Sequence, residues 1–96
     1  MTNYPTKPMQ DLFIAINSLK NSTELANFFR DLMTIKELQD ISVRWEIAQL
    51  LAKKIPYLTI AKQCHVSTTT VTRVALWLEH GTGGYQTAIS RSKKHS

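Results

Sequence analysis

A cluster of hydroxyl-bearing and cationic side chains stands out near residue 70. Its members are Ser67, Thr68, Thr69, Thr72, Arg73 and, slightly earlier, Lys62. Such groups can bond phosphate oxygens or base edges, and a threonine methyl can touch thymine. Threonine is a mediocre helix former, so four of them within residues 68–72 need a reason beyond helix stability. Local capping with Ser67 is the plainer explanation, and it accounts for Thr70 better than for the others.

The apolar residues around this cluster predict two helices joined by a tight turn at residues 65–67. The first helix is short and capped by Thr59, and the second is capped by Ser67 and ended by Gly81. The residues predicted to face inward are Ile60, Ala61, Cys64, Val71, Val74 and Leu78. Ala61 suits a close crossing, where two steeply inclined helices leave room for little more than a methyl group. Residues 59–79 therefore predict a helix-turn-helix whose outward face is the polar cluster.

Charge is divided unevenly along the chain. Residues 1–46 carry five Lys or Arg and six Asp or Glu, whereas residues 47–96 carry seven and one. The first half thus has a net charge of −1 and the second half of +6, which together give +5 for the whole chain. The basic half contains the helix-turn-helix. Small basic domains are common, but this coincidence favours attraction to a phosphate backbone.

Composition limits the class of protein. Ninety-six residues suit one small domain, and only three Gly and three Pro argue against a loop-rich or all-β chain. A lone cysteine rules out an internal disulfide framework and fits a reducing compartment. No apolar run approaches ~20 residues, so we expect a cytoplasmic protein with no membrane span.

The rest of the chain predicts four more helices. We expect a flexible arm at 1–8, one helical domain at 9–91 and a flexible tail at 92–96. Within the domain, residues 9–54 form the dimerisation helices, and a last short helix follows at 85–91. The helix starts are signalled by Asn21 with Glu24 and by Thr34 with Glu37, which are both capping patterns.

The N-terminal helices carry more large apolar groups than short helices of one small chain need, among them Phe13, Phe28 and Phe29. A well-filled core is one interpretation. We favour a homodimer in which these helices pack on a partner chain, since half-site readers of DNA usually work as two-fold pairs.

Four stretches carry a resemblance to a known family. They are Asp31-Leu-Met-Thr34, Arg44 within Val-Arg-Trp-Glu-Ile, Thr-Val-Thr-Arg73, and His80-Gly-Thr-Gly-Gly-Tyr-Gln86. Over residues 9–90 the chain resembles the Trp repressor superfamily, and within it the Trp repressor-like proteins of the YerC/YecD type. The resemblance implies an all-α, six-helix fold, an intertwined homodimer and transcriptional regulation by binding double-stranded DNA. One departure is His65 at a turn position that tends toward positive φ and is often glycine, which histidine tolerates better than most residues.

A second departure concerns the effector. The resemblance places Thr34, Arg44 and Arg73 where tryptophan-binding members surround their ligand, but Val74 and Trp77 stand where small residues should be. We therefore expect a vestigial pocket that does not accept L-tryptophan. Trp77 either fills this pocket from within or packs against the dimer partner. Arg73 could instead contact phosphate or a base, and the plainer interpretation is a solvated helix cation.

No pattern of catalytic or metal-binding residues is present in the sequence. Cys64 and His65 are neighbours that point about 100° apart on a helix, and no spacing resembles a zinc site. We predict no enzyme activity, cofactor or metal. The main hypothesis is a DNA-binding transcriptional regulator, and the alternative is a small adaptor that binds protein or RNA. DNA is preferred because residues 67–73 offer neither an apolar anchor for a protein nor an aromatic ring for RNA bases.

Overall fold

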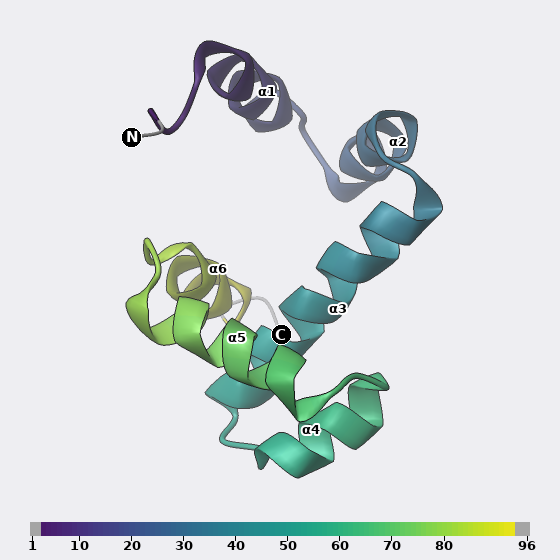
Figure 1. Ribbon diagram of the computed structural model, residues 1–96. Helices are drawn as coiled ribbons and strands as arrows, with labels where there is room; N and C mark the ends of the chain where they lie inside the picture. The colour runs from purple at the N-terminus through teal and green to yellow at the C-terminus, as the bar shows by residue number, and fades with distance from the viewer. Residues whose placement is uncertain (1–2, 94–96) are drawn as a thin grey trace. The chain divides into compact units, whose positions relative to one another are not determined.

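The computed structural model describes residues 3–93, and all regular structure in that range is α-helical, as predicted (Figure 1). The helices are α1 (Lys7–Asn17), α2 (Ser22–Leu32), α3 (Ile35–Ala52), α4 (Tyr57–Cys64), α5 (Thr68–His80) and α6 (Gly84–Lys93). The chain divides into two compact units, one ending at Leu38 and the other beginning at Gln39. None of the described helices is long and apolar enough to cross a membrane.

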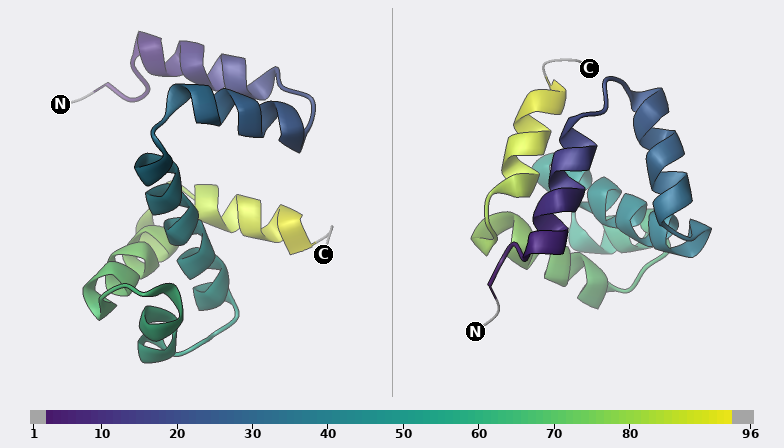
Figure 2. Two further views of the ribbon diagram at one scale, coloured as in Figure 1. Left: turned by 90° about the vertical axis from the view of Figure 1, so that its right-hand side faces the viewer. Right: turned by 90° about the horizontal axis from the view of Figure 1, so that it is seen from above.

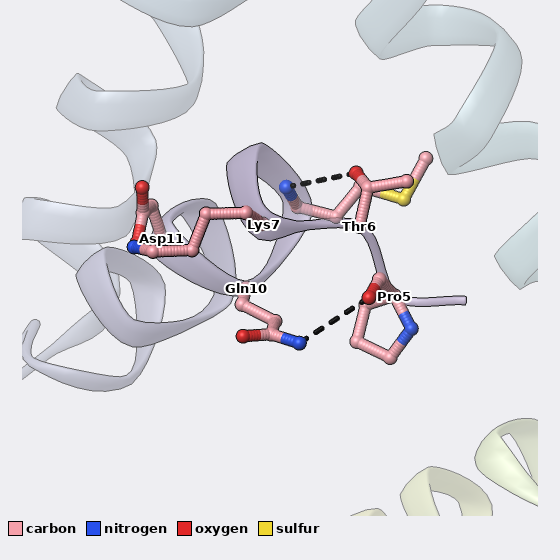
Figure 3. A network of polar contacts seen from close by, with 6 residues as sticks. Pro5, Thr6, Lys7, Gln10 and Asp11 are labelled. Atoms are coloured by element: carbon pink, nitrogen blue, oxygen red, sulfur yellow. Dashed lines mark hydrogen bonds and ion pairs between the residues drawn. The ribbon is translucent and has the colours of Figure 1, made fainter. Parts of the chain in front are cut away.

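Helix α1 begins earlier than the sequence predicted. Thr6 caps it by accepting a hydrogen bond from the backbone N–H of Met9, and the Gln10 amide donates to the Pro5 carbonyl oxygen at 3.3 Å. Lys7 and Asp11 form an ion pair across the first turn (Figure 3). Pro8 was expected to belong to the arm at 1–8, but proline is well tolerated in a first helical turn because its missing N–H would have no partner there. Residues 1–2 of that arm lie outside the described residues.

The predicted starts of the next two helices are confirmed. Asn21 accepts from the Glu24 N–H at 2.9 Å, and the Glu24 carboxylate accepts from the Lys20 N–H at 2.8 Å. Thr34 and Glu37 form a reciprocal capping box, with distances of 3.1 and 2.9 Å between each side-chain oxygen and the other residue's backbone nitrogen. Despite their apolar stripes, α1 and α2 have no buried residue.

The buried core lies in the second unit. Its largest fully buried side chains are Ile47 of α3, Ile60 of α4 and Val71 of α5, and Ile89 of α6 joins the same cluster. In this unit α4, α5 and α6 surround the C-terminal part of α3 (Figure 2). The rings of Trp45 on α3 and Tyr85 on α6 are stacked, with centroids 6.4 Å apart and planes inclined by 14°.

Two helix ends differ from the prediction. Pro56, not Thr59, is the N-cap of α4, and the Ile60 N–H donates to the Pro56 carbonyl oxygen at 3.0 Å. Proline here has the extended ψ of an N-cap and a fixed φ of −60°, so the observed cap lies three residues before the predicted one. Helix α6 runs two residues beyond the predicted 85–91, and residues 94–96 of the predicted tail lie outside the described residues.

Glycine is required at the end of α5. A Cβ on Gly81 would lie 2.4 Å from the Trp77 carbonyl oxygen, which accepts the Gly81 N–H at 3.0 Å. Gly83 has a φ of +89°, and the Gln86 amide then donates back to the Leu78 carbonyl oxygen at 2.8 Å. These contacts confirm Gly81 as the end of α5 and fix α6 against it.

Candidate nucleic-acid interface

Helices α4 and α5 form the predicted helix-turn-helix. His65 has φ 57° and ψ 45°, the left-handed conformation expected at this turn. The Val66 N–H donates to the Ala61 carbonyl oxygen at 3.0 Å, and the His65 N–H donates to that of Lys62 at 3.4 Å. These two bonds make a Schellman motif, which satisfies the last carbonyls of α4 and redirects the chain into α5.

Ser67 caps α5, as predicted. Its Oγ accepts from the Thr70 N–H at 3.2 Å and lies 3.1 Å from the Thr70 Oγ1. The interpretation of Thr70 as part of local capping is therefore confirmed, and its side chain is half-buried. A neutral cap at this position fixes the exposed first turn of α5 without adding a negative charge.

The inward residues of the two helices are placed as predicted. Ile60 and Val71 are fully buried, Ala61, Cys64 and Val74 are buried, and Leu78 is half-buried against the same core. The small Ala61 side chain belongs to the contact between α4 and α5. Because these residues fix both helices, the outward face of α5 is held on a rigid scaffold.

The outward cluster is also placed as predicted. Every one of its side chains is exposed: Lys62, Ser67, Thr68, Thr69, Thr72 and Arg73. Lys62 lies on α4, and the others lie at or within the first two turns of α5. The Thr72 Oγ1 donates to the Thr68 carbonyl oxygen at 2.9 Å, a contact that the sequence pattern did not reveal.

Two further exposed polar residues, Gln63 and His65, lie at the turn next to this cluster. The sequence pattern marked His65 only as a turn residue with positive φ, and it did not single out Gln63. Their signal was their place between Lys62 and Ser67, because polar residues at a tight turn stay exposed while the neighbouring Cys64 is buried.

The residues of the expected effector pocket come from both units of the chain. Thr34 is in the first unit, where its hydroxyl caps α3, whereas Arg44 and Arg73 are exposed in the second. Val74 is only 3% exposed and belongs to the core. Trp77 is 62% exposed in the single chain, so the second unit by itself does not enclose it, and its place in a pocket stays a prediction. Packing of Trp77 against a partner stays a prediction.

Cys64 has the properties of a structural thiol. Its Sγ donates to a Glu46 carboxylate oxygen at 3.3 Å, which ties α4 to α3. Burial, with a smaller contribution from Glu46, raises the pKa of the Cys64 thiol. A thiol that stays protonated at neutral pH is a poor nucleophile and metal ligand. Among the described residues, no three His, Cys, Asp or Glu side chains are grouped to hold a metal ion.

The family model of the Trp repressor protein matches residues 7–93. The chain belongs to the Trp repressor family. It is 38% identical over 88 residues to YerC of Bacillus subtilis (strain 168), which covers 92% of this chain and 85% of YerC. This is a family of helix-turn-helix regulators, so the resemblance carried by the sequence motifs is confirmed.

Solved structures agree with this assignment. The fold is similar to that of a TrpR-like protein from Eubacterium eligens, with a TM-score of 0.87, 38% identity and coverage of 93% of this chain and 92% of the other. It is also similar to a structure from Staphylococcus aureus described as a candidate Trp repressor, with a TM-score of 0.85, 33% identity and coverage of 92% and 88%. The helix-turn-helix of this Trp repressor family member therefore has the fold that its sequence predicted.

Proposed function

We propose that this protein is a homodimeric, sequence-specific DNA-binding regulator of transcription that places α5 in the major groove. The observation that carries the proposal is the outward face of residues 67–73. It exposes only hydroxyl groups and the guanidinium of Arg73, on a helix held by Ile60 and Val71. Such a face can bond phosphates and base edges but offers no apolar anchor for a protein.

The electrostatics support the same partner. The half of the chain that contains α4 and α5 has a net charge of +6, and Glu79 is its only acidic residue. Lys62 and Arg73 are exposed, and neither side chain has a hydrogen bond or ion pair with another described residue. Their charges are thus available to phosphates, and binding should release counterions.

Helix-turn-helix proteins commonly bind two half-sites one helical turn apart with two copies of the motif. The exposed Leu76 and Trp77 follow the polar face along α5. We assign them to the dimer rather than to DNA, because they lie beyond the first two turns that enter a groove. Membership of a regulatory family supports a role without enzymatic chemistry.

The direct test is selection of bound duplexes from random DNA, followed by affinity measurements across a salt series. We expect log K to fall with log salt by about 0.9 for each phosphate contacted. Arg73→Ala should weaken the selected duplex at least tenfold. Arg91→Ala removes the same charge from α6 and serves as the matched control.

The outcome that contradicts the proposal is an absence of duplex binding at low salt, or binding without a salt slope. Equal, small losses for Arg73→Ala and Arg91→Ala would mean that α5 is not the reading helix. A preference for single-stranded RNA over duplex DNA would favour the adaptor interpretation.

A further inference from the structure

We propose that Thr72 reads thymine through its methyl group, so that each half-site carries a thymine opposite this residue. The inference rests on the proposed DNA-binding function and deepens it by naming the base recognised at one position. It comes from the way the hydroxyls of α5 are already used within the protein.

The Thr72 hydroxyl has no proton left to offer. A hydroxyl carries one donor, and that of Thr72 is directed to the Thr68 carbonyl oxygen at 2.9 Å. Phosphate oxygens, both guanine acceptors, adenine N7 and thymine O4 all need a donor. While this bond is kept, Thr72 can present DNA with its methyl group and with an acceptor lone pair only.

The neighbouring hydroxyls are in a different state. Those of Ser67 and Thr70 bond each other at the cap, 3.1 Å apart. Thr68 and Thr69 are exposed, and their hydroxyls make no hydrogen bond with the described residues. The free donors thus lie at the start of α5, and Thr72, one turn later, is the exposed threonine whose donor is occupied.

Thr72 can still present its methyl group or an acceptor lone pair of its hydroxyl oxygen. Of these two, the methyl group is better suited to recognising a base. Acceptor contacts to the amino groups of adenine or cytosine are usually made by longer carboxamide or carboxylate groups. The Thr72 oxygen is held against the backbone of the preceding turn, where its reach is short. A methyl contact with the thymine C5-methyl needs no change in this bond and excludes water from both groups.

The experiment replaces thymines of the selected duplex one at a time by deoxyuridine, which removes only the C5-methyl. We expect one position in each half-site at which affinity falls about fourfold, the equivalent of one buried methyl group. Thr72→Val keeps the methyl and should retain this response. Thr72→Ser keeps the hydroxyl and should bind the thymine and uracil duplexes equally.

The matched controls are Thr69→Val and Thr69→Ser, which make the same chemical changes one turn earlier and should leave the uracil response intact. A bound duplex with no uracil-sensitive thymine overturns this inference but not the proposed function. The same holds if the response survives in Thr72→Ser, if it is lost in Thr72→Val, or if the sensitive position prefers adenine or cytosine. Failure to bind any duplex would instead remove the proposed function itself.

Discussion

The two units of the chain use similar apolar residues in opposite ways. From residue 39 onward, isoleucine, valine and alanine side chains of four helices meet in a core, with Ile47, Ile60 and Val71 fully buried. In the first unit no residue of α1 or α2 is buried, and Phe13 is 43% exposed. Amphipathic helices gain most of their stability from burying the apolar face. The first unit therefore needs a second surface, whereas the second has its core within one chain.

The largest expected effect is in that core. Ile60→Ala should lower the free energy of unfolding by about 2–5 kcal/mol, because it removes a fully buried side chain and leaves a cavity. Leu58→Ala on the same helix is the control, since Leu58 is 69% exposed and should change stability by about 0.5 kcal/mol or less. Urea unfolding followed by circular dichroism measures both. Equal losses would mean that the core of the second unit is not where the structure places it.

The next effect tests the first unit. We expect the wild-type protein to sediment at twice its chain mass of 11.0 kDa at micromolar concentration. Phe13→Asp should weaken the dimer at least tenfold, roughly 1.4 kcal/mol, because a carboxylate would replace an aromatic ring in the interface. Asn17→Ala, at an exposed polar position of α1, is the control. A wild-type species of 11.0 kDa under these conditions would contradict the dimer.

A smaller effect concerns strain, which is also unevenly divided. Lys54 and His65, the two non-glycine residues with positive φ among those described, both lie in the second unit. Strained conformations persist where the surrounding packing determines them. His65→Gly should raise the free energy of unfolding by about 0.5–1 kcal/mol, as relief of the left-handed strain exceeds the added entropy of the unfolded chain. Thermal unfolding measures the change, and a loss of stability would mean that the His65 side chain itself contributes.

The last prediction is that L-tryptophan does not bind. Val74 is part of the core, and Val74 and Trp77 stand where the resemblance leads us to expect small residues beside the ligand. Calorimetry with millimolar L-tryptophan should therefore show no saturable heat. Saturable binding that also tightens affinity for DNA would overturn this prediction.

Much of this structure could be predicted because its signals are local. The Thr34–Glu37 capping box, the Ser67 cap and the positive φ of His65 depend on residues within four positions of each other. The inward face of α5 followed from helical periodicity for the same reason.

The features that the sequence did not determine depend on contacts that residue spacing does not encode. Trp77 lies three residues after the buried Val74, yet it is 62% exposed, so helical spacing alone does not tell what surrounds it. The N-cap of α4 is Pro56 and not the predicted Thr59, because a fixed backbone φ angle can start a helix without a side-chain hydrogen bond. The Thr72 hydroxyl has two staggered choices in a helix, and the sequence does not select between them.

The two tryptophans give the molecule a built-in optical comparison between its interior and its surface. Trp45 is half-buried and stacked on Tyr85, whereas Trp77 meets solvent on the helix that carries the polar face. Indole emission shifts to longer wavelength in water, so the two rings emit at distinguishable energies. With Trp77 replaced by Phe, the remaining signal reports loosening of the second unit's core. With Trp45 replaced, it reports whatever covers the end of α5, without any attached dye.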